Sequence, residues 1–150
     1  ASDVYKRQGI KETLPVVLLG LVIIFCVGIL GDFLLRLEGL ETTSNQQSVE
    51  EIVQAIPKGL ILIFAGVIGP IFEEGIFRVG IQAFFKPASK IGILVSSILF
   101  ALVHTPTDIG SFVIYWGMGL ALSWVYLRTG RFEAAVLTHF VWNVIGILML

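Results

Sequence analysis

Two adjacent carboxylates, Glu73 and Glu74, lie in a segment, 59–85, that is otherwise apolar apart from Arg78 and Gln82. A charged side chain at the centre of a membrane helix costs about 2.5 to 3.5 kcal/mol on insertion scales, so two neighbouring carboxylates require a specific role. Residues four apart share one face of a helix, and Glu74 can therefore form an ion pair with Arg78. Glu73 lies about 100° round the helix from Glu74, away from this pair, which makes it the candidate for chemistry.

Two histidines and an asparagine lie in other apolar segments. His104 ends the segment 91–104, and His139 is followed four residues later, on the same helical face, by Asn143. Counted at 1.5 Å per residue from the expected helix ends, these side chains and Glu73 reach comparable depths of about 10 to 20 Å. They can therefore converge. A carboxylate, two imidazoles and an amide could then activate water and stabilise the oxyanion formed in amide hydrolysis.

The same residues allow a structural interpretation and a metal-binding one. An ion pair accounts for Glu74 and Arg78, and a membrane histidine commonly hydrogen-bonds a neighbouring helix. Alternatively, Glu73, His104 and His139 could bind zinc, with water as the fourth ligand. The H-E-x-x-H pattern of helical zinc proteases is absent. A metal-free glutamate mechanism is therefore the preferred interpretation, with a divalent metal such as zinc as the alternative.

Composition places the chain in a membrane. Hydrophobic residues make up 56% of the sequence and charged residues 14%, with a mean hydropathy of +0.92, whereas a soluble domain carries about 25% charged residues. The net charge of −1 provides no basic field for nucleic acid. The lipid bilayer is therefore an expected partner and nucleic acid is not. The single cysteine, Cys26, can form no internal disulfide.

The apolar segments predict an all-α, polytopic transmembrane helical bundle. About 20 apolar residues cross a bilayer, which gives five candidate spans, the third of them short: 13–31, 57–85, 91–104, 110–127 and 134–150. Basic residues gather before the first span, between the second and third, and between the fourth and fifth. The positive-inside rule then predicts a multi-pass protein of the cell membrane with a cytoplasmic N-terminus.

The chain divides into three parts on this basis. Residues 1–12 are a polar N-terminal remnant, 13–56 are the first transmembrane helix with its extracytoplasmic linker, and 57–150 form the core that carries the polar residues. Because the chain begins with Ala1 and ends inside an apolar segment, it is expected to be a fragment. Ser48 and Glu51 have the spacing of a capping box, which predicts a short interfacial helix that starts there and runs toward Pro57.

A proline precedes the two carboxylates. Pro70 follows Gly69, lacks an N–H and clashes with the preceding helical turn. The Gly69–Pro70 sequence predicts a kink in the helix. This kink would place Glu73 near the start of a half-helix, where the helix dipole favours an anion.

Three motifs carry a resemblance to a known family. Glu73 to Arg78 reads E-E-x-x-x-R, Phe100 to His104 reads F-x-x-x-H, and His139 to Asn143 reads H-x-x-x-N. In this order, and each on an apolar segment, they resemble the CPBP family of intramembrane proteases, the CAAX prenyl endopeptidase, bacteriocin-processing and Abi-like group. The resemblance covers about residues 57–150. The chain differs from many members in having fewer spans and in carrying Val79, where glycine follows the motif arginine.

The resemblance implies a prokaryotic membrane hydrolase, an intramembrane endopeptidase of the glutamate or the metal-dependent type (a metalloprotease in the latter case). Its substrate would be a membrane-associated peptide or protein. Glu73 would be the general base, His104 would hold the water, and His139 with Asn143 would line the oxyanion site, while Glu74 and Arg78 brace the helix. Two alternatives stay open: a non-catalytic membrane adaptor in immunity or sensor regulation, and a small proton-coupled transporter.

Overall fold

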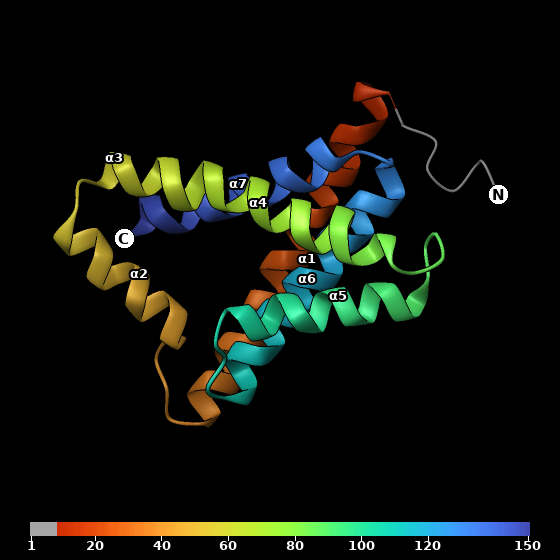
Figure 1. The fold of residues 1–150 in the computed structure, drawn as a ribbon. Coiled ribbons are helices and arrows are strands. Elements are labelled where there is room, and N and C mark those ends of the chain that lie inside the picture. The colour runs from red at the N-terminus through yellow and green to blue at the C-terminus, as the bar shows by residue number, and fades with distance from the viewer. Residues whose placement is uncertain (1–8) are drawn as a thin grey trace.

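The chain folds into helices joined by short turns, as the computed structural model in Figure 1 shows for residues 9–150, the part that the structure describes. The elements in chain order are α1 (Ile10–Leu37), α2 (Ser44–Ala55), α3 (Lys58–Ile61), η1 (Leu62–Ile68), α4 (Gly69–Glu74), η2 (Gly75–Ile81), α5 (Lys90–Val103), α6 (Ile109–Thr129) and α7 (Phe132–Met149). The all-α class expected from the sequence is confirmed. Residues 1–8 of the predicted polar remnant lie outside the described residues, whereas Ile10 to Glu12 already belong to the first turn of α1.

Four of the described helices are long and apolar enough to cross a membrane: Ile10–Leu37, Lys58–Ile81, Ile109–Thr129 and Phe132–Met149. The segment expected as the third of five spans forms α5, which has 14 residues. At 1.5 Å per residue this helix is about 21 Å long, shorter than the hydrocarbon core of about 30 Å. The bundle therefore combines four long apolar helices with one short one.

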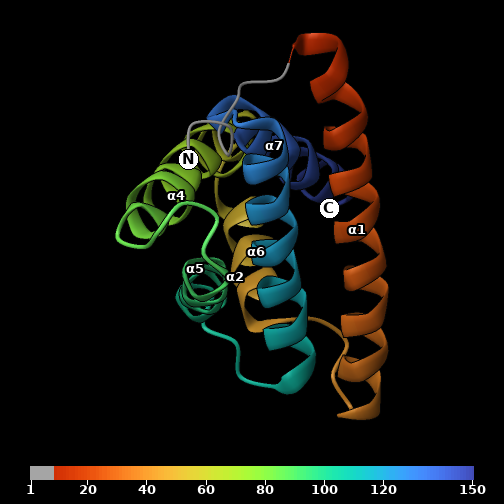
Figure 2. The same ribbon diagram turned by 90° about the vertical axis from the view of Figure 1, so that its right-hand side faces the viewer.

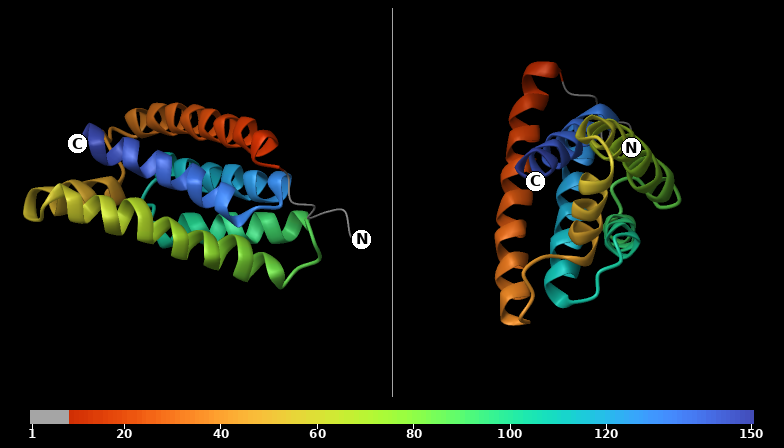
Figure 3. Two further views of the ribbon diagram at one scale, coloured as in Figure 1. Left: turned by 90° about the horizontal axis from the view of Figure 1, so that it is seen from above. Right: turned by 90° about the vertical axis from the view of Figure 1, so that its left-hand side faces the viewer.

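Helix α6 is the centre of the bundle. It packs against α1, α5 and α7, and 44% of its most apolar window is buried, compared with 22% for α1. Figure 2 shows α1 and α6 side by side over most of their lengths, and Figure 3 shows the same pair from two further directions. The outer face of α1 exposes large apolar side chains such as Leu18, Phe25 and Phe33, as expected of a surface that contacts lipid.

Glycine allows the α1 and α6 backbones to touch. A Cβ atom added to Gly110 would lie 2.7 Å from the backbone nitrogen of Leu35 and 2.8 Å from the carbonyl oxygen of Gly31. Both are backbone atoms, which cannot move aside as a flexible side chain could. In a membrane the hydrophobic effect does not drive helices together, so their association depends on close van der Waals packing, which small residues permit.

The segment Lys58–Ile81 is one continuous helix in which π-helical stretches, η1 and η2, flank α4. Ile68 and Gly69 keep helical dihedral angles, and the N–H of Gly69 donates to the carbonyl of Phe64, five residues earlier. The predicted start of a half-helix at Pro70 is therefore wrong. The wider π register accommodates the proline without ending the helix, since a π-bulge redistributes the hydrogen bonds of one turn.

Side-chain caps begin the helices α2 and α6. Helix α2 begins at Ser44, with Thr43 accepting a hydrogen bond from the N–H of Gln46, so the predicted start at Ser48 is wrong. Ser48 lies inside the helix and donates to the carbonyl of Ser44. At the start of α6, Asp108 accepts from the backbone N–H of Ser111 at 2.6 Å. Partial burial raises the pKa of Asp108, but hydrogen bonds from Ser111 and Thr107 outweigh it and hold that pKa below its usual value.

Candidate active site

The ion pair expected between Glu74 and Arg78 lies in the interior of the bundle. Arg78 Nε donates to Glu74 Oε2 at 2.9 Å, and both side chains have 0% exposure. Arg78 Nη1 donates to Ser96 Oγ at 3.1 Å, and Ser96 Oγ donates to the carbonyl of Phe77 at 2.6 Å. The guanidinium also lies 5.0 Å from the ring centre of Phe100. Among the described residues Arg78 Nη2 makes no hydrogen bond, but the other groups of this cluster are paired.

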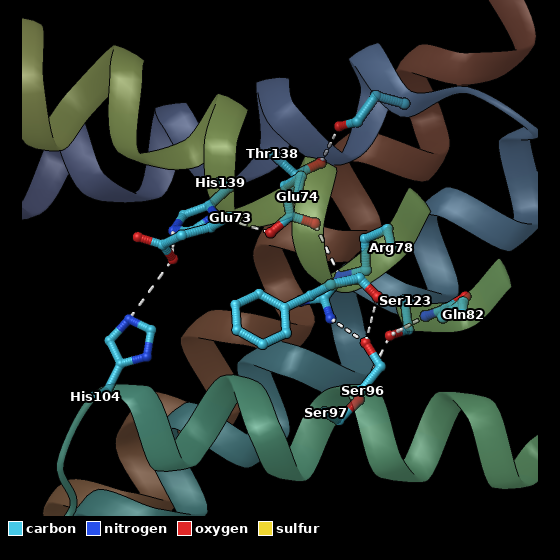
Figure 4. A network of polar contacts seen from close by, with 12 residues as sticks. Glu73, Glu74, Arg78, Gln82, Ser96, Ser97, His104, Ser123, Thr138 and His139 are labelled. Atoms are coloured by element: carbon cyan, nitrogen blue, oxygen red, sulfur yellow. Dashed lines mark hydrogen bonds and ion pairs between the residues drawn. The ribbon is translucent and has the colours of Figure 1, made fainter. Parts of the chain in front are cut away.

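Glu74 has a second partner that the sequence did not indicate. Its Oε1 lies 3.0 Å from Nδ1 of His139, which is on α7, 65 residues later in the chain (Figure 4). A carboxylate paired with a guanidinium is ionised and can only accept, so Nδ1 of His139 carries the hydrogen. Glu74 therefore braces its own helix through Arg78 and orients His139 as well.

His104 is held in the same tautomer by a different acceptor. It follows the last residue of α5, and its Nδ1 lies 2.7 Å from the carbonyl oxygen of Phe100. A carbonyl only accepts, so Nδ1 is the donor and Nε2 of the neutral ring keeps its lone pair. The residues at both ends of this hydrogen bond belong to the F-x-x-x-H motif, which explains the spacing of four between them.

Glu73 faces both of these histidines. Its Oε2 lies 3.8 Å from Nε2 of His104 and 3.9 Å from Nε2 of His139. The Glu73 side chain is 32% exposed, yet Oε2 is buried and accepts no hydrogen bond from the described residues. Figure 4 shows Glu73 and His104 facing each other across this space. Three hydrogen-bond acceptors therefore converge without a donor among them.

Asn143 lies one turn beyond His139 on α7, and its amide is bound to backbone. Asn143 Nδ2 donates to the carbonyl of Ala65 at 2.9 Å. In the π register seen at Gly69, this carbonyl would accept from the N–H of residue 70, and Pro70 has none. The asparagine side chain thus replaces a hydrogen bond that the proline removes. One N–H of the amide is used in this way, and the second is available to another acceptor.

These four predicted residues line one cavity of about 400 Å³. Glu73, His104, His139 and Asn143 are in its wall, together with apolar side chains from α1, α6 and α7 that include Leu35, Met118 and Trp142. Thr43, Asn45 and Gln46 line the cavity from the side of α2. The cavity volume is within the range of small-ligand sites, about 300 to 1,000 Å³.

The predicted zinc ligands are spaced more widely than zinc requires. Tetrahedral bonds of about 2.0 to 2.2 Å would bring the three ligand atoms to about 3.3 to 3.6 Å from one another, whereas Glu73 Oε2 is 3.8 and 3.9 Å from the two imidazole nitrogens. Within residues 9–150 no three His, Cys, Asp or Glu side chains are arranged to hold a metal ion.

Sequence reasoning missed a second row of buried polar side chains beside the site. Gln82 Nε2 donates to Ser123 Oγ at 3.0 Å, and Ser97 lies 3.4 Å from the same hydroxyl. These residues and Ser96 join η2, α5 and α6. The available signal was the Ser96–Ser97 pair in the middle of an apolar helix, where hydroxyls usually hydrogen-bond a neighbouring helix.

Residues 55–145, more than half of the chain, match the family described as Type II CAAX prenyl endopeptidase Rce1-like. The chain belongs to this family. The Rce1-like match spans all three motifs and agrees with the protease class expected from them. No solved structure matches the chain.

Bacterial relatives of this Rce1-like chain extend the match to nearly its whole length. UPF0177 protein YvdC of Lactococcus lactis is 34% identical over 153 residues, 99% of this chain and 58% of that protein. YdiL of Bacillus subtilis is 29% identical over 151 residues, 95% of this chain and 60% of its own length. The membrane-embedded CAAX protease MroQ of Staphylococcus aureus is 29% identical over 147 residues, 91% of this chain and 58% of that protein. The chain thus spans about three fifths of the length of these relatives.

Proposed function

We propose that this chain carries the reacting centre of an intramembrane endopeptidase, which hydrolyses a peptide bond of a membrane-associated protein or peptide with water activated by Glu73. The observation that carries the proposal is the convergence of Glu73 Oε2 with the two Nε2 atoms at 3.8 and 3.9 Å. Separations of this size leave room for a water molecule whose oxygen lies about 2.8 Å from Glu73 Oε2 and from Nε2 of His104. Such a water can donate its hydrogens to Glu73 and to His104.

The proposed reaction begins with proton transfer to Glu73. As the water oxygen bonds to the peptide carbonyl carbon, its proton moves to Glu73 Oε2, and the carbonyl oxygen becomes an oxyanion. Glu73 then passes this proton to the peptide nitrogen as the C–N bond breaks. The amine product leaves and a carboxyl product remains, so the carboxylate returns to its starting state.

The oxyanion would be stabilised from α7. Since Nδ1 of His139 already donates to Glu74, Nε2 of His139 can donate to the oxyanion only after it has taken up a proton. The second N–H of the Asn143 amide is the other donor available in the cavity wall. Donors directed at developing charge commonly contribute about 10² to 10³ in rate.

Glutamate chemistry without a metal is the preferred form of the proposal. Zinc in this site would require Glu73, His104 and His139 to move closer together than the distances above. The metal-free route uses the three side chains as they lie. Removal of metal therefore distinguishes the two forms, as set out among the predictions below.

The orientation we propose has the N-terminus in the cytoplasm, because the basic residues between helices follow the positive-inside rule. Single cysteines placed at Ser44 and at Ala88, after Cys26→Ser, test it. An impermeant thiol reagent applied to intact cells should label the first and leave the second unlabelled until the cells are lysed. Labelling of the second position alone would reverse the orientation.

Glu73→Gln tests the chemistry. Removal of a general base commonly lowers the rate by about 10² to 10⁴, so the variant should lose cleavage of membrane peptides that the wild-type protein cuts. Cleavage is measured by mass spectrometry of membrane peptides from cells with either protein. The unfolding midpoint in detergent should stay unchanged, because Glu73 Oε2 accepts no hydrogen bond from the described residues. A folded Glu73→Gln protein with full biological activity would favour the adaptor.

A further inference from the structure

The imidazole of His104 stacks on a tyrosine that the proposed chemistry does not use. The rings of His104 and Tyr115 are nearly parallel, at 15°, with centres 4.4 Å apart. Tyr115 is on α6 and is 9% exposed. The bond from Nδ1 to the Phe100 carbonyl fixes one end of the His104 ring, and rotation about that bond is limited by what lies against the ring. The Phe100 ring contacts it at a tilt of 41°, with centres 4.6 Å apart, and Tyr115 provides the stacked contact.

The Tyr115 hydroxyl is itself held by the N-terminal end of α2. It lies 2.9 Å from the hydroxyl of Thr43, and Asn45 Nδ2 donates to it at 3.2 Å. Because Asn45 supplies the donor, the tyrosine hydrogen is free to point at Thr43 Oγ1. Thr43 also caps α2. The tyrosine ring is therefore fixed at both ends, by the stack on His104 and by residues that lie about 70 positions earlier in the chain.

A second contact joins the N-terminal end of α2 to the residue after His104. Ser44 Oγ donates to the carbonyl of Thr105 at 3.0 Å. Thr105 has a φ of 49°, a left-handed conformation that is rare for a β-branched residue and persists only where neighbouring contacts impose it. Three consecutive residues, Thr43 to Asn45, therefore restrain His104 through two independent contacts.

We propose that Tyr115 is a positioning residue, which holds the His104 imidazole so that Nε2 faces Glu73, and that Thr43 and Asn45 set the position of Tyr115. Phenylalanine or leucine would be sufficient at position 115 if the side chain only filled space, and neither has a hydroxyl group. Here the hydroxyl has two partners on another element, and the ring contacts a candidate catalytic side chain. The catalytic consequence of this arrangement rests on the proposed function, whereas the restraint on His104 does not.

The restraint can be measured without any activity assay, because the described chain contains two histidines, His104 and His139. Diethyl pyrocarbonate modifies accessible imidazole nitrogens, and peptide mass spectrometry reports each site separately. In Tyr115→Leu the modification rate of His104 relative to His139 should rise about 2- to 10-fold, which corresponds to the loss of one aromatic pair. Phe112→Leu is the matched control, because Phe112 is on the same helix and stacks on Trp116; it should leave the ratio unchanged.

Two milder variants distinguish the contribution of the Tyr115 ring from that of its hydroxyl. They also test the proposal if Tyr115→Leu fails to fold. Tyr115→Phe keeps the stack, and Thr43→Val removes the hydrogen-bond partner without changing the size of the side chain. Both should raise the His104 ratio, by less than Tyr115→Leu. Unchanged ratios in these two variants, or in folded Tyr115→Leu, would overturn the proposal.

The effect on turnover then links the restraint to function. In Tyr115→Leu, kcat should fall about 2- to 10-fold with KM nearly unchanged, since the tyrosine acts through His104. Tyr115→Phe should recover most of the loss. If kcat is unaffected while the His104 ratio rises, the positioning role in catalysis is overturned. If the wild-type protein cleaves nothing and Glu73→Gln is fully active in cells, the proposed function fails while the chemical-modification result stands.

Discussion

Two neighbouring glutamates have opposite surroundings. The Glu74 cluster (Glu74, Arg78, Ser96 and His139) is a set of short hydrogen bonds in the bundle interior. The Glu73 cluster (Glu73, His104 and His139) has three acceptor atoms 3.8 and 3.9 Å apart and no hydrogen bond between them. A stable fold requires the first arrangement, because an unpaired buried charge is costly. The second arrangement stores unused hydrogen-bonding capacity, which a substrate or water can satisfy.

His139 joins the two clusters. Its Nδ1 belongs to the Glu74 cluster and its Nε2 to the Glu73 cluster. A change in the charge of Glu74 should therefore reach the site through His139. The following predictions test this connection and the different weight of the two glutamates in folding.

The largest effect is expected from Arg78→Met. This change leaves Glu74 buried without its cation, which should lower the free energy of unfolding by about 3 to 5 kcal/mol. Chemical denaturation in detergent measures the loss. Arg128→Met is the control, because Arg128 is exposed near the end of α6, and a surface change of this kind stays within about 0.5 kcal/mol. Equal losses in both variants would mean that the buried pair does not stabilise the bundle.

Glu74→Gln should have a smaller effect on folding but should act on both clusters. The amide cannot accept through its nitrogen, so either Arg78 or His139 loses its acceptor, at a cost of about 1 to 3 kcal/mol. Nitrogen NMR of the His139 ring should show a changed tautomer population. Glu73→Gln is the matched comparison and should change neither quantity. The same unfolding free energy for the two variants would contradict the division of roles between the glutamates.

The smallest effect is expected from metal removal. If Glu73 acts without a metal, a membrane-permeant chelator should leave cleavage unchanged, and added zinc should not increase it. The control is a zinc protease treated in the same vesicles. Activity that disappears with the chelator and returns with zinc would replace the glutamate mechanism by the zinc alternative.

Contacts within one helix could be predicted from the sequence, and contacts between helices could not. The spacing of Glu74 and Arg78 is enough to pair them, and the three motifs are enough to single out Glu73, His104, His139 and Asn143. The bond between His139 and Glu74 joins residues 65 positions apart, and no local pattern indicates it. The serine hydroxyls that bind Arg78 and Gln82 were missed for the same reason.

Local sequence signals also gave wrong predictions where contacts between helices determine which signal the structure uses. Thr43 and Ser48 are both acceptable helix caps, and the structure uses Thr43, whose hydroxyl also meets Tyr115. Pro70 predicts a break, but the π register and the Asn143 amide together satisfy the backbone around it. Helix length was predictable here, because the expected segment 91–104 and the observed α5 (Lys90–Val103) both have 14 residues.

The cluster of acceptors at Glu73 also has a consequence for what leaves the site. Hydrolysis creates a new carboxylate beside Glu73 and the two Nε2 atoms. The new carboxylate and Glu73 carry like charges, which repel, and burial strengthens the repulsion because screening by water is weaker there. The bond cleavage that the site would promote thus turns a neutral guest into an anion that Glu73 repels. On this basis the acyl product should be a poor inhibitor.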